Sequence, residues 1–366
     1  MKIGILTFHR ALNHGAFLQC FALKTYLEQA GHLVEVIDYW PKYHEQVYRY
    51  FKLSRFKKSG VKYLIVYILT LPLLIIRKEK MIKLQRKYLG VGRRVKYPNI
   101  QTLKKFHGDC VIYGSDQIWW KNNNCSTGYD LGYWGDGIVE DINKVSYAAS
   151  MGVQNILEED TQLINQKLSR FIHLSVREDC LKKELVNILD KDIHICLDPT
   201  FLIPKSVWLG YCHRVRVNKP FLLLMNLLNS NEAKLIADKI ASEKNMEIVE
   251  LTGSVTHVDY NSHYVQTADA FDFISYIKEA DFIVTSSFHC TVFSILFEKE
   301  FISCGFKNNA GRVQTLLSSF GIEDRLVMDV NDISIASIDY DDVNKKIERL
   351  SSQSKDFLLN SLIWKR

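Results

Sequence analysis

The sequence lacks the short motifs that most often reveal an enzyme's chemistry. It contains no G-x-G-x-x-G, no Walker loop, no H-E-x-x-H and no G-x-S-x-G. These absences leave no sequence signature for a dinucleotide, for ATP, for a catalytic zinc ion or for serine hydrolysis. No group of His, Cys, Asp and Glu shows the spacing of metal ligands either, so we expect neither a metal ion nor a cofactor.

Disulfide-type cysteine spacing and a secretory signal are also missing. The 8 cysteines are spread along the chain with no C-x-x-C pair, which is typical of a protein in a reducing compartment. The chain begins Met-Lys-Ile-Gly-Ile-Leu and enters a strand-like segment at once, without a basic region, an apolar region and a cleavage site in sequence. We therefore expect a cytoplasmic protein.

Neither the charge nor the apolar runs are extreme. The formal net charge of +6 is modest, so nucleic acid is not an expected partner. The apolar run from Tyr63 to Ile76 is shorter than the roughly 20 residues that a membrane span needs, and Pro72 interrupts it. A chain of 366 residues with 47% hydrophobic residues exceeds what one core usually serves, so we expect two packed domains.

What the sequence does contain is a repeated alternation of strand and helix patterns. An apolar run, a stretch with apolar residues at helical spacing and an alternating stretch predict a β-α-β unit over residues 2–40. Further strands are predicted at 109–115, 144–150, 173–178 and 194–200. After Trp208 the pattern restarts, with strands predicted at 221–228, 246–253, 281–287 and 300–306 and helices at 231–244, at 270–279 and from 289.

This alternation predicts an α/β protein with two Rossmann-like domains. We assign residues 1–205 to the first domain and residues 206–340 to the second. Residues 341–366 read as a helix with an apolar face, which we expect to pack back across both domains.

Residues 42–108 break the pattern, and we expect a helical insertion there. Ten basic residues flank its apolar run: Arg55, Lys57, Lys58, Lys62, Arg77, Lys78, Lys80, Lys83, Arg86 and Lys87. One interpretation is a helical hairpin that rests on anionic lipid at the inner face of the membrane. The other is an ordinary insertion on the first domain, with Leu64, Ile65, Ile68, Leu69, Leu73 and Leu74 buried and the lysines in solvent.

Polar residues stand where several predicted strands end, which is where open α/β sheets bind ligands. Ser286, Ser287 and His289 form the turn from a strand into a helix, whose free N–H groups suit a phosphate or carboxylate. His289 is a candidate general acid or anion ligand there; the alternative is a structural histidine.

Two further strand ends carry candidates. Asp116 is a candidate base, with a helix cap as the alternative, and Trp119 offers a face for a sugar ring unless it belongs to the core. Arg177 can hold a carboxylate or phosphate at two points, or it can form a surface ion pair with Glu178 or Asp179.

The chain resembles the polysaccharide pyruvyl transferase family over nearly its full length. The matching stretches follow in family order: LTFHRALNHGAFLQCFALKTYL, VIYGSDQIWW, VSYAASMG, LSVRED, LDPTFLIPKSVW, TSSFHCTVFSILFEKEFI and NNAGRVQTLLSSFGIEDR. The resemblance implies a GT-B-like fold with the two domains facing a cleft. It also implies phosphoenolpyruvate as the donor, and as the acceptor a sugar of a surface polysaccharide or of its lipid-linked precursor.

The resemblance assigns roles to individual residues. His289 matches the family's histidine at the head of a second-domain helix, and Arg177 matches an arginine linked to donor binding. Many members have an arginine two residues before that histidine, where this chain has Ser287, and Cys290 stands where glycine is usual. We expect Arg312 or Arg325 to supply the missing charge.

These expectations combine into one mechanism. The donor binds on the second-domain side through Arg177, Arg312, Ser286, Ser287 and Arg325, with His289 as the acid and Asp116 as the base. The expected acceptor contacts, on the first-domain side, are Asn13, Gln19, Gln117 and Trp119. Two alternatives stay open: a GT-B glycosyltransferase that uses a nucleotide sugar, and a sugar-binding or scaffold protein without catalysis.

Overall fold

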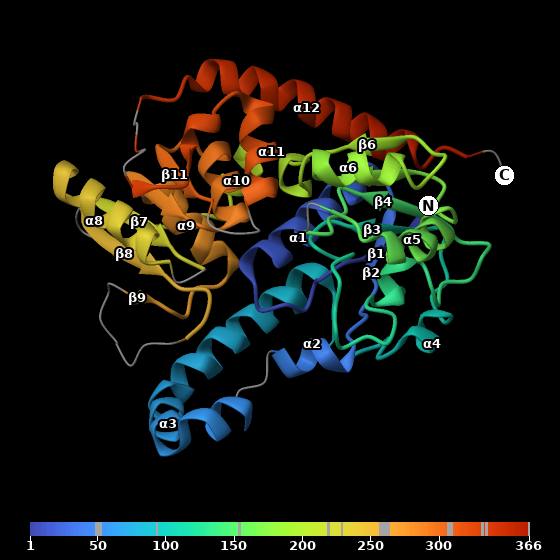
Figure 1. Cartoon of the computed structure of the whole chain (residues 1–366), viewed down its shortest axis with the longest axis horizontal. Helices are drawn as coiled ribbons and strands as arrows, with labels where there is room; N and C mark the ends of the chain where they lie inside the picture. Colours follow the sequence, from blue (N-terminus) through green and yellow to red (C-terminus); the bar gives the residue numbers. More distant parts are fainter. Residues whose placement is uncertain are drawn as a thin grey trace.

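Two parallel β-sheets, one in each half of the chain, form the framework of the molecule (Figure 1). The structure is a computed structural model, and it describes residues 1–47, 53–92, 94–152, 155–217, 220–227, 230–255, 264–305, 310–330, 333 and 336–364. The predicted α/β class with two Rossmann-like domains is confirmed, because strands and helices alternate in both halves and every strand pair is parallel.

The first sheet has the strand order β2-β1-β3-β4. Its strands are β1 (Lys2–Leu6), β2 (Leu33–Val36), β3 (Cys110–Gly114) and β4 (Asn143–Tyr147). A pair of strands, β5 (Leu174–Val176) and β6 (Ile193–Ile195), continues it through bridges from Val145 to His173 and from Ala149 to Val176. β3 is buried along its whole length, as expected for a parallel sheet covered on both faces.

The second sheet has the order β12-β11-β10-β7-β8-β9. Its strands are β7 (Phe221–Met225), β8 (Glu247–Leu251), β9 (Tyr264–Val265), β10 (Phe282–Thr285), β11 (Phe301–Cys304) and β12 (Leu326–Val327). The two edge strands, β9 and β12, are two residues long and were not predicted, since so short a segment carries no periodic signal. The predicted strand at 221–228 ends earlier, and Leu228 lies outside the described residues.

The helices of the first half are α1 (His14–Gln29), α2 (Lys42–Val47), α3 (Leu53–Leu84), η1 (Gln85–Leu89), α4 (Ile100–Leu103), η2 (Leu131–Trp134), η3 (Glu158–Asp160), α5 (Thr161–Leu168), α6 (Asp179–Val186), η4 (Pro199–Phe201) and α7 (Lys205–Leu209). Those of the second half are α8 (Asn231–Lys244), α9 (Ala270–Glu279), α10 (Phe288–Leu296), α11 (Ala310–Phe320), η6 (Glu323–Arg325) and α12 (Tyr340–Asn360).

Helix α1 lies between the two domains and explains why they share a core. Every residue from His14 to Leu23 is buried, which is the pattern of a helix covered all round. On the second-domain side Phe17 packs against Phe271 at 5.8 Å between ring centroids, and His14 Nε2 lies 2.9 Å from the carbonyl oxygen of Ala268. One hydrophobic cluster therefore contains residues of both sheets and of the helix between them.

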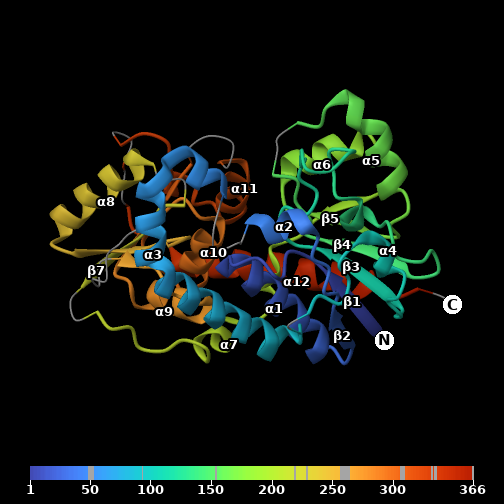
Figure 2. The same ribbon diagram turned by 90° about the horizontal axis from the view of Figure 1, so that it is seen from below.

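The insertion does not pack on the first domain alone. Helix α3 bends at Gly60, which has a φ of 52°, and runs along the lower side of the molecule (Figures 1 and 2). Arg77 donates hydrogen bonds to the carbonyl oxygens of Thr252, Gly253 and Gln266, all in the second domain.

The interpretation of the insertion as an ordinary packed one required six apolar side chains to be buried, and four of them are exposed. Leu64 is 36% exposed, Ile65 53%, Ile68 58% and Leu69 46%, while Leu73 and Leu74 are partly buried. Within the part of the chain that the structure describes, no helix combines the length and the apolar character needed to cross a bilayer.

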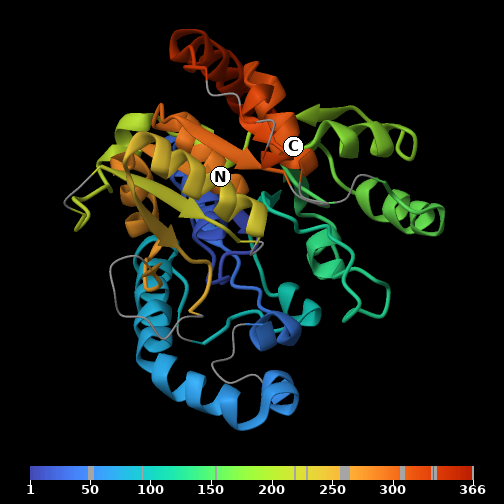
Figure 3. The ribbon, with the colours of Figure 1, turned by 60° about the vertical axis from the view of Figure 1, so that its left-hand side comes forward.

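Helix α12 lies on the side opposite to α3 (Figure 3). It begins beside the second domain, where the Tyr340 hydroxyl donates to the carbonyl oxygen of Lys299. Further along, Ser351 Oγ donates to the carbonyl oxygen of Phe201 at 2.8 Å, and Ser354 Oγ accepts from the Leu197 N–H at 3.0 Å. The helix therefore contacts both domains.

Candidate active site

The centre of the site is a buried ion pair between residues that follow neighbouring strands. Arg177 follows β5 and Asp198 lies beyond β6; Nη1 of the arginine is 2.8 Å from Oδ2 of the aspartate. Asp198 is 1% exposed, and its Oδ1 accepts from the backbone N–H and the hydroxyl of Thr200 at 3.1 and 2.8 Å. The surface ion pair considered for Arg177 is wrong, because the side chain is buried and its close partner is Asp198.

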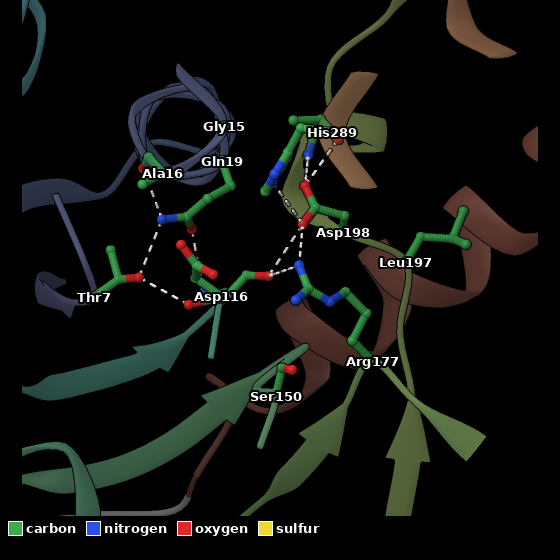
Figure 4. A network of polar contacts seen from close by, with 12 residues as sticks. Thr7, Gly15, Ala16, Gln19, Asp116, Ser150, Arg177, Leu197, Asp198 and His289 are labelled. Carbon is green, nitrogen blue, oxygen red and sulfur yellow. Dashed lines mark hydrogen bonds and ion pairs between the residues drawn. The ribbon is translucent and has the colours of Figure 1, made fainter. Parts of the chain in front are cut away.

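Asp198 is ionised in this environment. Burial alone would raise the pKa of its carboxyl group, but the neighbouring His289 and Arg177 outweigh burial and hold the pKa below its ordinary value. Ser115, which follows β3, donates a further hydrogen bond from Oγ to Oδ2 at 3.2 Å. The carboxylate thus fixes groups from three elements at one point (Figure 4).

His289 reaches the same carboxylate from the second domain. It is the second residue of α10, is 8% exposed and has its Nε2 3.5 Å from Asp198 Oδ2, too far for a good hydrogen bond. Gly15 of α1 lies against the imidazole, and a Cβ atom at that position would stand 2.1 Å from Nδ1. Glycine is therefore needed at residue 15 for α1 and the histidine to approach each other.

A second arginine lies close to the first. The guanidinium carbons of Arg177 and Arg312 are 4.3 and 5.8 Å from the centre of the Phe288 ring, within the range of cation–π contacts. Burial, and then the like charge of Arg177, lower the pKa of Arg312 below its ordinary value. Two partly desolvated cations side by side repel each other, so an anion bound between them would be strongly favoured.

Several buried polar atoms of this cluster make no hydrogen bond within the described part of the chain. Among the residues that the structure describes, Arg177 Nε and Nη2 and His289 Nε2 make no hydrogen bond. A buried donor left unsatisfied costs about 1–3 kcal/mol, so such atoms cluster where a ligand completes them. The arrangement is suited to an anion with several acceptor oxygens.

Glu178 adds a carboxyl group beside the two arginines. Ser150 Oγ donates to its Oε1, while in the described part of the chain its Oε2 has no hydrogen-bond partner. Burial raises the pKa of Glu178 above its ordinary value, against the opposing effect of Arg177.

Asp116 lies in the turn after β3 and faces the same group of charges. Its φ of 73° is in the left-handed region, and its carboxylate accepts from the Gln117 N–H at 2.8 Å. No helix follows directly, so the helix-cap alternative is wrong for this residue. The Asp116 charge acts on Arg312, where it opposes the lowering of the pKa.

Three residues that were expected to contact a substrate have other roles in the structure. Trp119 is fully buried, donates from Nε1 to the carbonyl oxygen of Tyr133 and packs on Trp134, so it belongs to the core and offers no face to a sugar. Gln19 is also fully buried and connects Thr7 Oγ1 with the Ser115 N–H. The guanidinium of Arg325 is held by Glu300, by Asp324 and by the carbonyl oxygen of Ala336, so it does not join the cluster of Arg177.

The remaining expected residues have local roles in the structure. Asn13 is exposed and caps α1, accepting from the N–H groups of Gly15 and Ala16. Ser287 caps α10 through the Cys290 N–H at 3.4 Å, and Ser286 Oγ accepts from the Leu227 N–H at 2.9 Å. Gln117 is partly buried and adjoins Gly152.

Sequence reasoning missed Asp198, Ser115, Glu178 and Gly15. Asp198 had a usable signal, because it stands near the end of the strand predicted at 194–200 and directly before Pro199. The contact of Gly15 with His289 had none, since it depends on how the two domains meet.

The fold is similar to that of known GT-B enzymes. UDP-GlcNAc 2-epimerase from Methanocaldococcus jannaschii, solved with UDP-GlcNAc and UDP, matches with a TM-score of 0.50 and 13% identity over 96% of this chain and 93% of that one. The Neisseria meningitidis UDP-GlcNAc 2-epimerase bound to UDP-GlcNAc has a TM-score of 0.49 and 8% identity, over 100% of this chain and 95% of that one. E. coli heptosyltransferase WaaC with ADP has a TM-score of 0.40 and 9% identity, over 96% of this chain and 100% of that one.

The fold is therefore an α/β fold of the GT-B type, with charged residues of both domains meeting between its two sheets. The model of the polysaccharide pyruvyl transferase family matches residues 13–308. The chain belongs to that family, and it is a transferase. A comparison of the sequence with curated proteins finds no match.

Proposed function

We propose that this chain moves the enolpyruvyl group of phosphoenolpyruvate onto a sugar of a surface polysaccharide or of its lipid-linked precursor, forming a pyruvate ketal. The observation that carries the proposal is the set of buried, unsatisfied nitrogens of Arg177 and His289, found among the described residues and beside Arg312. Phosphoenolpyruvate presents a carboxylate and a phosphate, and planar guanidinium groups bind both at two points. We place the reaction in the cytoplasm, on the inner side of the membrane.

The roles follow from the position of each group. Arg177 and Arg312 hold the anionic groups of the donor, while Asp198 fixes Arg177 and faces His289. His289 gives a proton to the methylene carbon, which leaves a cationic centre at C2. A sugar hydroxyl adds to C2 and gives its proton to Asp116. A second hydroxyl then adds to C2 as the C2–O bond to phosphate breaks; its proton goes to His289, and the phosphate takes up the proton held by Asp116.

The test is direct. Purified protein is incubated with phosphoenolpyruvate and candidate glycans, and the products are examined for the mass of a pyruvate ketal together with released phosphate. His289→Ala serves as the variant that should lose the reaction. Phosphate release without a modified glycan, or turnover that the variant retains, contradicts the proposal.

The second candidate is a glycosyltransferase that uses a nucleotide sugar. It is favoured by the similarity to an epimerase that was solved with UDP-GlcNAc and UDP. Since fold does not settle donor chemistry, parallel incubations with nucleotide sugars decide between the two: sugar transfer without phosphoenolpyruvate would support this candidate.

A further inference from the structure

An apolar stripe lies exposed along α3. Its exposed fractions are Val61 69%, Leu64 36%, Ile65 53%, Ile68 58%, Leu69 46%, Ile75 43% and Ile76 46%. The spacing of three and four residues places these side chains on one face of the helix. Exposed contiguous apolar surface of this kind marks an interaction site in a protein that folds normally elsewhere.

The opposite face of the helix is fixed to the body of the protein. Thr70, Arg77, Met81 and Gln85 are buried, and Lys80 pairs with Asp272 of α9 at 2.9 Å. Arg77 holds the helix on three carbonyl oxygens of the second domain. The stripe is therefore presented outward on a helix that cannot turn its apolar face inward.

Basic residues continue the stripe. A groove beside its end is lined by Ile76, Glu79, Lys80, Lys83, Arg86 and Lys87. Because Lys80 pairs with Asp272, three cations accompany the carboxylate of Glu79. Before the stripe the helix carries Arg55, Lys57 and Lys58, whose side chains lie outside the described residues. Apolar residues that continue into a basic groove match a layer of apolar chains below anionic headgroups.

A second copy of the chain fits this face less well. Two such helices packed in parallel through this face would bring the cations of one groove next to those of the other. Like charges at that distance repel, whereas anionic headgroups attract all of them. The charge pattern therefore selects a lipid surface as the occupant.

We propose that the exposed face of α3, with the groove of Lys83 and Lys87, docks on the surface of an anionic bilayer without crossing it. This inference rests on the proposed function in one respect: the lipid-linked acceptor of that reaction would lie in the same lipid surface. The insertion follows β2 at the carboxyl edge of the first sheet. Its end contacts the loop before α1, where Arg10 donates to the carbonyl oxygen of Gly92 at 2.7 Å.

The experiment is flotation of the full-length protein with phosphatidylcholine vesicles and with vesicles that also contain phosphatidylglycerol, in the absence of any substrate. The apolar variant is Ile65→Ser/Ile68→Ser, the charge variant is Lys83→Gln/Lys87→Gln, and the matched control is Leu235→Ser. Leu235 is 56% exposed on α8, away from α3.

We expect binding to anionic vesicles that weakens as salt rises. Two lysines at about 1 kcal/mol each correspond to a loss of roughly 30-fold in partitioning for the charge variant. The apolar variant should lose at least about tenfold, because each isoleucine loses its burial in lipid. The control should partition like the wild type.

Three results would overturn the inference: no binding to anionic vesicles at low salt, equal losses in the control, or a dimer in sedimentation that Ile65→Ser/Ile68→Ser dissociates. The last would make the face an interface between two copies. Because no substrate is present, none of these results bears on the transfer reaction, and failure of phosphoenolpyruvate turnover would leave vesicle binding intact.

Discussion

Asp198→Asn tests the centre of the site most sharply, because it removes one charge and keeps the shape of the side chain. The carboxylate accepts from Arg177, Ser115 and Thr200 and is 1% exposed. An amide in its place leaves the buried Arg177 guanidinium without its close counter-charge, since Glu178 Oε1 is 3.9 Å from Nε. Breaking a buried pair in this way costs about 3–5 kcal/mol.

The measurement is the free energy of unfolding from urea titrations of the wild type and Asp198→Asn at neutral pH. Asp136→Asn is the matched control, since Asp136 pairs with Lys167 and Arg170 at 2.9 Å but is partly exposed. Pairs of that kind contribute about 1 kcal/mol or less. If Asp198→Asn destabilises the protein no more than the control does, the buried pair is not the organising contact that the structure indicates.

The same variant gives a test against pH. The folded-state pKa of Asp198 lies below its ordinary value, so its ionisation stabilises the folded protein at pH above that value, about 3.9. This contribution is lost as the pH falls from there toward the folded pKa. The difference between wild type and Asp198→Asn should therefore be full at pH 7 and shrink below about pH 4; a constant difference would contradict the assignment.

Three further predictions concern the proposed reaction. His289→Ala should lower the turnover rate by about 10²–10⁴ with little change in thermal unfolding; near wild-type turnover would remove it from the mechanism. Arg312→Ala should raise the KM for phosphoenolpyruvate, and Arg312→Lys should restore little, because a point charge cannot make a two-pronged contact; unchanged titrations would place the donor elsewhere. Gly15→Ala should lower turnover, because its Cβ would stand 2.1 Å from His289 Nδ1; wild-type kinetics would show that the ring need not stay in place.

The framework of the site could be predicted because it follows from strand order. Residues directly after parallel strands lie at the edge of a sheet where ligands bind, and this singled out Arg177 and His289 as candidates. Their common place between the two domains was implied only by the family resemblance, because they follow strands of different sheets. Asp198 as their common partner could not be read in the same way. Its pairing depends on the side-chain direction beyond β6, and a residue before a proline in an irregular turn has no periodic pattern to fix that direction.

Arg312 and Arg325 show why equivalent sequence arguments diverge in three dimensions. Both were candidates for the missing cation. Arg312 lies in the first turn of α11 (Ala310–Phe320) and Arg325 lies beyond its end, and a helix of that size is about 16 Å long. Arg312, near its start, lies by Phe288, whereas Arg325 lies past its end with Glu300. The prediction for Trp119 failed for another reason. In a turn after a strand the side chains do not alternate between two faces, so the burial of Trp119 could not be predicted.

The serine at residue 287 bears on how the proposed anion site is built. Ser287 caps α10 through the Cys290 N–H, as a serine does well and an arginine does not. The helix start then offers its N–H groups and the positive end of its dipole on one side of the cluster. The guanidinium of Arg312 comes from α11 and lies over the Phe288 ring that also faces Arg177. Because the charge and the cap come from different helices, each can have the residue type that suits it, and the anion site keeps two guanidinium groups without an arginine at position 287.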